Sequence, residues 1–416
     1  MTTTMVPEKG AAGAPAIAPH VRDYVERVRG GELGALPAVT GLVVLCAVFS
    51  VLRPAFLSPI NFANLFTQGA AVAVIAMGLI FVLLLGEIDL SAGFASGVCA
   101  AVLGVLLTNE GWPWYAAVLA AMATGAAIGL VIGTLVAKLG IPSFVVTLAA
   151  FLAFQGVVLL LLKEGTNISI RDQTILAIAN RNMPPVLGWV CVAAGVLAYA
   201  ALQVMQARRR TARGLSAVPT SLIAFRVGTL AVISGVAVFL LNLERSRNAA
   251  IVSLKGVPIV VPVIVVLLVV LTFVLQRTAY GRHIYAVGGN AEAARRAGIN
   301  VDRIRISAFV ICSFMASVGG VIAASRANSV DPNTGGSNVL LFAVGAAVIG
   351  GTSLFGGKGR ALDALLGGAV VAMIENGMGL MGYTSGVKYA VTGCVLLLAA
   401  GVDALSRKRA AATGRR

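Results

Sequence analysis

The sequence predicts an all-α integral membrane protein, a bundle of about twelve transmembrane helices, and three observations lead to this class. Of the 416 residues, 58% are hydrophobic and only 12% are charged, whereas a soluble domain carries roughly 25% charged residues. Apolar windows long enough to cross a hydrocarbon layer of about 30 Å recur along the chain. The 48 glycines suit helix contacts in lipid, where small residues let backbones approach closely.

Twelve apolar windows define the expected crossings. They lie near residues 37–52, 64–85, 90–108, 114–136, 144–162, 187–205, 222–242, 257–276, 304–326, 338–351, 362–381 and 387–403. The third and tenth windows are short or rich in glycine, so either could be broken or re-entrant, and the expected count is ten to twelve. We therefore expect one transmembrane domain over 37–405, between an N-terminal tail of 1–36 and a basic C-terminal tail of 406–416.

The N-terminal tail shows no cleavable signal pattern, because no short apolar core precedes a small-residue cleavage site. Residues 2–19 are rich in alanine, proline and glycine, and we expect them to be disordered. Residues 21–30 place Val21, Tyr24, Val25 and Val28 on one face. They predict either a short amphipathic helix on the membrane surface or a plain solvated tail.

The distribution of basic residues predicts the orientation. With the N-terminus in the cytoplasm and the crossings alternating, 23 of the 32 lysines and arginines fall on the cytoplasmic side and 9 outside. Because cytoplasmic loops are enriched in these residues, an even number of crossings with both termini cytoplasmic is favoured. The net charge of +16 then faces anionic lipid, and nucleic acid is not needed as a partner. The longest external segment, 163–186, is short, so another protein would capture an external solute.

Motifs for nucleotide, metal or enzyme chemistry fail on spacing. The segment Gly350–Arg360 resembles a phosphate loop, but Lys358 is followed by Gly359 instead of the serine or threonine that would bind magnesium. A tight turn that glycine permits, with two cations at the cytoplasmic face, explains it better. The five cysteines lie singly in apolar windows and the two histidines lie far apart, so no metal site or cofactor is expected. No nucleophile–base pair suggests an enzyme.

Polar residues inside the apolar windows are candidates for a translocation path, because such side chains face the bundle interior or a cavity instead of lipid. Glu375 and Asn376 lie well inside the eleventh window. A hydrogen bond between helices and a contact with a transported solute explain them equally well. Gln68 and Gln155 have the same two interpretations, with the structural one favoured.

An acidic pair, Glu87 and Asp89, lies where the second and third windows meet. Carboxylates within a membrane are typical of ion-coupled carriers, which would make this pair functional. The favoured alternative is local structure, because Asp89 and Ser91 could cap the next helix.

The charged, glycine-punctuated segment Tyr280–Asn300 interrupts two very apolar stretches and encodes a discrete short helix. Asn290 is a preferred N-cap residue, since its side-chain oxygen can accept a hydrogen bond from a free backbone N–H. Glu292 lies in the first turn, where the positive end of the helix favours it. Arg295 and Arg296 lie in the last turn, where the negative end favours them.

Gly298 can take the left-handed conformation that ends a helix. Residues 291–297 are therefore predicted to form a seven-residue helix about 10 Å long, after a bend supplied by Gly288 and Gly289. A helix this short is marginal in water, so it needs a surface to lie on. We expect a docking element for another subunit; a solvated connector is the alternative.

Six segments, in the order of a known family, carry a resemblance to the permease subunits of ABC sugar importers of the ribose, xylose and galactoside group. They are FLSPINFANLF (Phe56–Phe66), GEIDLSAG (Gly86–Gly93), IPSFVVTLAAFLAFQGV (Ile141–Val157), GRHIYAVGGNAEAARRAGINVDRIR (Gly281–Arg305), VIGGTSLFGGKGR (Val348–Arg360) and ENGMGLMG (Glu375–Gly382). The likeness covers roughly residues 40–405. The glutamate of GEIDLS, the extra crossings around Arg208–Arg213 and the NGM run look most like the D-xylose permeases.

The resemblance implies a non-catalytic translocation subunit of the bacterial cytoplasmic (inner) membrane, importing D-xylose or a similar pentose. It implies a homodimer on a dimeric or tandem ATPase, which binds the ATP, and an extracytoplasmic sugar-binding protein. The residues Asn290–Gly298 would form the coupling helix that the ATPase pushes, giving alternating access. Two alternatives stay open, a self-contained secondary carrier or channel, and a related ABC permease for branched-chain amino acids or nucleosides.

Overall fold

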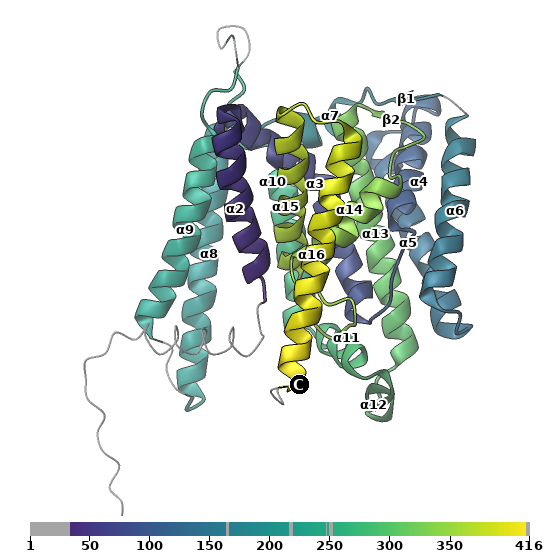
Figure 1. Ribbon diagram of the computed structural model, residues 1–416, viewed down its shortest axis with the longest axis vertical. Coiled ribbons are helices and arrows are strands. Elements are labelled where there is room, and N and C mark those ends of the chain that lie inside the picture. The colour runs from purple at the N-terminus through teal and green to yellow at the C-terminus, as the bar shows by residue number, and fades with distance from the viewer. Residues whose placement is uncertain (1–33, 164–165, 216–218, 247, 249–252, 413–416) are drawn as a thin grey trace, which may run out of the picture. The chain divides into compact units, whose positions relative to one another are not determined.

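The computed structural model describes residues 34–163, 166–215, 219–246, 248 and 253–412, which are mostly helical (Figure 1). The predicted disordered segment 2–19 and the amphipathic segment 21–30 lie outside these residues. The chain divides into two compact units, of which the larger comprises residues 34–185 and 240–405. Its elements are α2 (Leu36–Leu52), η1 (Pro54–Leu57), α3 (Pro59–Leu84), α4 (Ala92–Gly104), η2 (Val105–Asn109), α5 (Trp114–Lys138), α6 (Ser143–Leu162), β1 (Ile168–Ser169), α7 (Gln173–Asn180), α10 (Val260–Arg277), α11 (Ala279–Gly289), α12 (Ala291–Arg296), α13 (Val301–Ala327), β2 (Ser329–Val330), α14 (Ser337–Ile349), α15 (Ala361–Leu380) and most of α16 (Ser385–Ala412).

The smaller unit comprises, among the described residues, 186–215, 219–239 and 406–412. It contains α8 (Pro185–Ala212) and α9 (Thr220–Leu241). Both helices are strongly apolar, yet only 6% of either apolar window is buried by protein. Helices that are apolar all round and little covered by protein are suited to a lipid environment. Arg209 and Arg210 lie in the last turn of α8, where a negative helix end favours them.

Each of the twelve predicted apolar windows coincides with a helix, which confirms the all-α membrane class. Among the described residues, nine helices are long and apolar enough to cross a membrane, whereas the apolar parts of α2, α14 and α16 are shorter. The count of twelve crossings therefore stays a prediction. The third window continues from α4 into the π-helical turn η2, and the tenth is the 13-residue helix α14.

Helix α13 lies at the centre of the larger unit and packs most extensively against α5 and α3. Three glycines of α5 spaced by four residues, Gly125, Gly129 and Gly133, share one face, against which the α13 backbone lies. A Cβ atom at Gly129 would lie 2.3 Å from the carbonyl oxygen of Phe309. The two backbones are therefore in direct contact, as small residues allow in membrane bundles.

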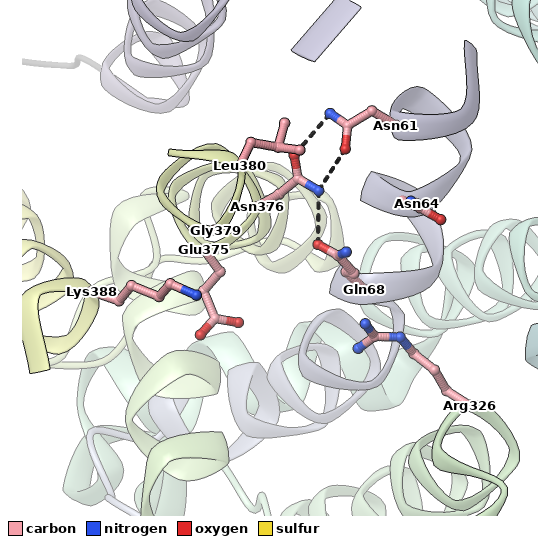
Figure 2. A pocket seen from close by; sticks show the side chains of 9 residues that line it. All are labelled: Asn61, Asn64, Gln68, Arg326, Glu375, Asn376, Gly379, Leu380 and Lys388. Atoms are coloured by element: carbon pink, nitrogen blue, oxygen red, sulfur yellow. Dashed lines mark hydrogen bonds between the residues drawn. The ribbon is translucent and has the colours of Figure 1, made fainter. Parts of the chain in front are cut away.

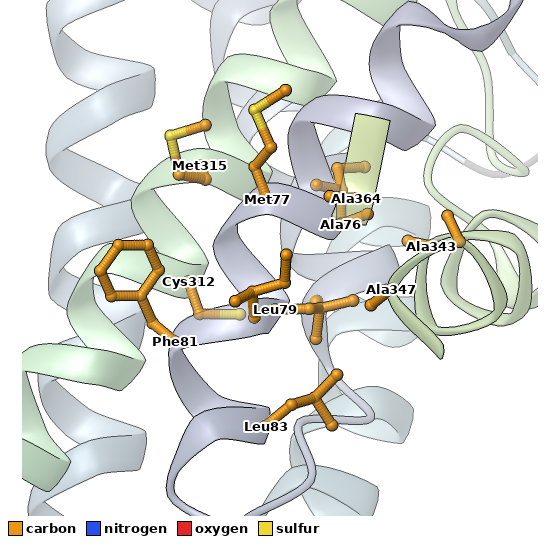
Figure 3. Packing of buried hydrophobic residues seen from close by; sticks show 14 of the residues in the cluster. Ala76, Met77, Leu79, Phe81, Leu83, Cys312, Met315, Ala343, Ala347 and Ala364 are labelled. Carbon is orange, nitrogen blue, oxygen red and sulfur yellow. The ribbon is translucent and has the colours of Figure 1, made fainter. Parts of the chain in front are cut away.

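The core around α3 and α13 is filled by apolar side chains. Figure 3 shows Met77 and Phe81 of α3 beside Cys312 and Met315 of α13, all of them buried. Gly78 completes the contact, because a Cβ atom there would lie 2.6 Å from that of Met315. This close packing fixes α3 and α13 side by side along the larger unit.

The larger unit has two differently built ends. At the end that we call the α12 end, α11 and α12 lie beside the last turn of α3, the start of α13 and the loop Gly350–Arg360 (Figure 1). At the opposite end, β1 and β2 form a short antiparallel pair in which Ile168 is opposite Val330. Helix α7, which the apolar windows did not predict, begins here with Asp172 as its N-cap. We call this the β1–β2 end.

Candidate functional site

The predicted short helix exists and is α12. The side chain of Asn290 accepts a hydrogen bond of 2.9 Å from the backbone N–H of Ala293, as an N-cap does. Gly298 has a φ of 83°, and its N–H bonds the carbonyl oxygen of Arg295, so the helix ends through the left-handed residue expected there. It comprises six residues, one fewer than predicted, because Ala297 is already the C-cap.

The charged side chains of α12 are exposed to solvent. Glu292 pairs with Arg296 at 3.1 Å and with Arg295 at 3.7 Å, along the helix's own surface. Exposed pairs of this kind contribute at most about 1 kcal/mol, so they leave the side chains free to rearrange against a partner. Only Ala294 of α12 is buried, which anchors one face of the helix.

The prediction of a bend at Gly288 and Gly289 is wrong. Both glycines belong to α11, and the chain turns at Asn290, which has φ −159° and ψ 101°. The sequence signal that was missed is a second cap, because the hydroxyl of Thr278 accepts a hydrogen bond of 3.2 Å from the N–H of Gly281. The buried residues of α11 follow it at a helical spacing; they are Gly281, Ile284 and Val287.

Helix α11 lies directly on the end of α3 and on the loop Gly350–Arg360. A Cβ atom at Gly288 would lie 1.8 Å from the carbonyl oxygen of Leu84 and 3.0 Å from the backbone nitrogen of Gly357. The N–H of Gly357 donates a 2.8 Å hydrogen bond to the same Leu84 oxygen. The hydroxyl of Tyr285 donates to the carbonyl oxygen of Gly359 at 2.6 Å. Burial raises the pKa of Tyr285, which keeps this hydroxyl protonated as a donor.

The loop Gly350–Arg360 is the tight turn that the sequence predicted. Gly351, Gly356 and Gly357 have φ values of 113°, 85° and 72°, which glycine adopts without strain. Lys358 is exposed. The loop thus serves as a packing surface for α11.

Glu87 and Asp89 lie at the α12 end. Glu87 forms an ion pair of 3.4 Å with Arg305 of α13. Asp89 is buried, and it accepts hydrogen bonds from the backbone N–H of Ser91 at 2.8 Å and from its hydroxyl at 2.6 Å. Burial raises the pKa of Asp89, against the effect of these bonds. Ser91 is the N-cap of α4, but its side chain makes no capping bond, so the predicted cap by Ser91 is wrong and its hydroxyl serves Asp89.

A third acidic residue ties α12 to the bundle. Asp302 lies in the first turn of α13 and pairs with Lys138 of α5 at 3.3 Å and with Arg295 of α12 at 4.0 Å. The three elements therefore share one cluster of exposed charges.

A polar cavity of about 330 Å³ lies towards the β1–β2 end, between the first turns of α3 and the last turns of α13 and α15. Figure 2 shows the residues that line it: Asn61, Asn64, Gln68, Arg326, Glu375, Asn376, Gly379, Leu380 and Lys388. The predicted candidates Gln68, Glu375 and Asn376 thus meet in one place. Gln155 is exposed on α6 and is absent from this lining.

Amide side chains form one wall of this cavity. Asn61 and Asn376 each donate a hydrogen bond of 2.8 Å to the other. Asn376 also donates to the side-chain oxygen of Gln68 at 3.1 Å. Asn61 in turn donates to the backbone oxygen of Phe56 at 3.0 Å. Because these groups satisfy one another, the wall is held in place before any solute enters.

Charged side chains form the other wall. Glu375 comes from α15, Arg326 from the end of α13 and Lys388 from the start of α16. Among the described residues, no ion pair within 4.0 Å joins the Glu375 carboxylate to either cation. The charges therefore face each other across open space.

Two further cavities continue from the first one. One has a volume of about 350 Å³ and includes Asn180 and Arg245. The other has a volume of about 450 Å³ and follows α3 inwards from Thr67 to Ile75. All three cavities share Gln68 and Arg326 in their linings. These two side chains therefore lie where the polar end meets the interior of the bundle.

Four polar cavity residues escaped the sequence prediction: Asn61, Asn64, Arg326 and Lys388. The two asparagines and Gln68 follow a spacing of three and four residues, which places them on one face of α3, so this signal was available. The two cations lie near the ends of apolar windows, where they count as ordinary flanking charges. Their position opposite Glu375 depends on tertiary structure.

A bundle of apolar helices with a polar cavity at one end and a self-capped, exposed short helix at the other has the architecture of a membrane permease. The family model described as the permease component of branched-chain amino acid transport systems matches residues 61–400. The chain belongs to this family of multi-pass permeases.

Relatives narrow the group within the family. The xylose transport system permease protein of Escherichia coli strain K12 is 36% identical over 356 residues, 85% of this chain and 87% of the relative. That of Haemophilus influenzae is 32% identical, over 88% and 95% of the two chains. The ribose import permease protein of Escherichia coli strain K12 is 30% identical, over 88% and 92%. The resemblance to ABC permeases of the xylose and ribose type is confirmed. No solved structure gives a significant match.

Proposed function

We propose that this chain is the transmembrane permease subunit of an ATP-driven importer of a monosaccharide, D-xylose or a similar pentose, and that a separate ATPase drives it through α12. The observation that carries the proposal is α12 itself. It is a self-capped helix whose charged face is exposed and whose remaining face is anchored to the bundle. An element of this kind is suited to docking a second protein.

Two packed routes connect α12 with the polar cavity. Helix α13 starts four residues after α12 and continues for 27 residues, about 40 Å at 1.5 Å per residue, before it presents Arg326 to the cavity. Helix α11 contacts the loop Gly350–Arg360, directly after which α15 begins and leads to Glu375. A displacement of α11 and α12 would thus reach the cavity through two helices, as alternating access requires.

The orientation follows from the basic residues. The excess of lysine and arginine in the predicted cytoplasmic segments supports a cytoplasmic α12 end, so the polar cavity would face outwards. Gln68, Glu375 and Asn376 would line the first part of the translocation path. The other subunits would be a second copy of this chain, an ATPase that binds and hydrolyses the ATP, and an extracytoplasmic sugar-binding protein. This chain would contribute no catalytic residue.

Reconstitution into liposomes tests the proposal. The purified chain is inserted alone, with its ATPase, and with both the ATPase and the sugar-binding protein, and uptake of labelled D-xylose is measured with and without ATP. We expect uptake only with the complete set and ATP. Uptake by the chain alone would instead establish a secondary carrier or channel. ATP-driven uptake of leucine or a nucleoside, but of no pentose, would assign the chain to another substrate class.

A further inference from the structure

We propose that Arg326 and Glu375 form a monosaccharide-binding site of the permease itself, which selects among sugars by their hydroxyl pattern after the binding protein has released them. The inference rests on the proposed function and assigns the recognition chemistry to particular side chains. Figure 2 shows both side chains pointing towards the cavity, from α13 and α15.

The amide wall leaves the charged side chains of the cavity unengaged, and of these Arg326 and Glu375 are the two that also line the inner cavity. Asn61, Gln68 and Asn376 are already engaged with one another. Within the part of the chain that the structure describes, the side chains of Arg326 and Glu375 make no hydrogen bond and no ion pair. A solute entering the cavity would therefore find an unused set of donors on one side and an unused set of acceptors on the other.

This division matches the chemistry of a polyhydroxy compound. A guanidinium group offers five N–H donors and no acceptor, and an ionised carboxylate offers only acceptors, whereas each hydroxyl both donates and accepts. Adjacent sugar hydroxyls can thus accept from Arg326 and donate to Glu375. Hydrogen bonds to charged groups are the stronger ones, and only a solute with hydroxyls on both sides would use them together.

Position and size also favour a site of this kind. Arg326 lines all three cavities, so a solute that moves from the outer cavity to the inner one would pass it. The outer cavity of about 330 Å³ lies at the small end of the range for small-molecule sites, about 300–1,000 Å³.

The test compares sugars in the complete transporter. Glu375→Gln and Arg326→Gln are each combined with the ATPase and the sugar-binding protein. The matched controls are Glu110→Gln and Arg53→Gln, which alter exposed residues of the same end outside the cavity lining. The sugar-binding protein is saturated in turn with D-xylose and with monodeoxy analogues of D-xylose. Differences in the binding protein's affinity for these sugars then do not affect the comparison. ATP-dependent uptake per loaded binding protein is then measured.

We expect each cavity variant to lower kcat/KM for D-xylose about tenfold, which corresponds to one lost hydrogen bond to a charged group. The kcat/KM for the analogue that lacks the contacted hydroxyl should fall less than twofold. The ratio of kcat/KM for D-xylose to that for the analogue therefore decreases. A change in this ratio separates recognition from stability, because a poorly folded transporter moves all sugars less to the same degree. The control variants should keep the wild-type ratio.

Equal losses for all sugars, or unchanged uptake, would overturn the site. If the glutamine variants are not recovered from the membrane, Glu375→Asp and Arg326→Lys take their place, and the same ratio decides. The outcome also separates the two proposals. A wild-type transporter that moves no pentose with ATP overturns the proposed function together with this site, whereas normal wild-type uptake with unaltered ratios overturns the site alone.

Discussion

Asn61 and Asn376, which are 315 residues apart in the sequence, exchange two hydrogen bonds of 2.8 Å each. Both side chains are buried, at 3% and 7% exposure. The exchange joins the first turn of α3 to the fifth turn of α15, directly beside the polar cavity. A buried amide that loses its partner keeps the full cost of its desolvation, so each asparagine depends on the other.

The first prediction concerns this pair. Asn61→Leu and Asn376→Leu should each destabilise the protein by about 1–3 kcal/mol, because each leaves the other amide unsatisfied. The double variant should cost clearly less than the sum of the two. Unfolding of the purified chain in detergent measures all three, with Asn64→Leu, a change of an exposed residue on the same helix, as the control. Strictly additive losses would mean that the two amides are not coupled.

The second prediction uses two adjacent glycines of α11. Gly288→Ala should disturb the contact of α11 with α3, because its Cβ atom would lie 1.8 Å from the Leu84 carbonyl oxygen. Gly289→Ala should be harmless, since no atom outside its own segment lies within 4 Å of the added carbon. We expect Gly288→Ala to lower sugar uptake per ATP hydrolysed at least severalfold in the reconstituted transporter, and Gly289→Ala to leave it unchanged. Equal behaviour of the two variants would remove α11 from the coupling route.

The third prediction concerns the exposed cations of α12. Reversing both charges, by Arg295→Glu and Arg296→Glu, should abolish the stimulation of the ATPase by the loaded binding protein. The helix bundle should stay folded, because the exposed pairs that are lost contribute little to stability. The control reverses Arg208 and Arg209, which are also exposed and predicted to be cytoplasmic. Normal stimulation by the α12 variant would argue against docking at this helix.

The fourth prediction is a pH dependence in the loop after α9. Glu244 accepts hydrogen bonds from the backbone N–H groups of Leu254 and Ser246 and from the hydroxyl of Ser253. These bonds lower its pKa from 4.5 to about 2. Since the folded-state pKa is depressed, the carboxylate contributes stability above pH 4.5, and this contribution is lost as the pH falls from 4.5 towards 2.

The difference in Tm between wild type and Glu244→Gln measures this effect. It should be largest above pH 4.5 and shrink progressively below it. Glu110→Gln, which changes an exposed carboxylate at the same end, is the control. A difference that does not change with pH would mean that the loop does not depend on the charge of Glu244.

Features held together by residues close in the sequence could be predicted, whereas features that depend on contacts between distant segments could not. The helix α12 was predictable because Asn290, Glu292, Arg295 and Gly298 act within a single segment of nine residues. Helix α11 was missed although Thr278 offers a local cap, because an isolated pattern of two glycines suggested a bend. Its buried face rests on Leu84 and on the loop Gly350–Arg360, far away in the chain.

The polar cavity was likewise predictable only in the residues whose signal is local. Its single polar residues in apolar windows, Gln68, Glu375 and Asn376, were recognisable because lipid disfavours them. Their partners were not. Arg326 has the pattern of an ordinary charge at the end of a crossing, and only the packing of α13 against α3 brings it opposite Glu375. The family resemblance predicted the class of permease but not which helices meet at the cavity.

The bare glycine face of α5 has a mechanical consequence. Because Gly125, Gly129 and Gly133 let the α13 backbone lie directly on that of α5, the two helices pack as one stiff pair. A stiff pair resists bending, so a displacement of its end near α12 would be transmitted along α13 to Arg326. The distance by which an ATPase displaces α12 would then set how far Arg326 moves away from Glu375. Once the two side chains are too far apart to contact one sugar together, the sugar would be released.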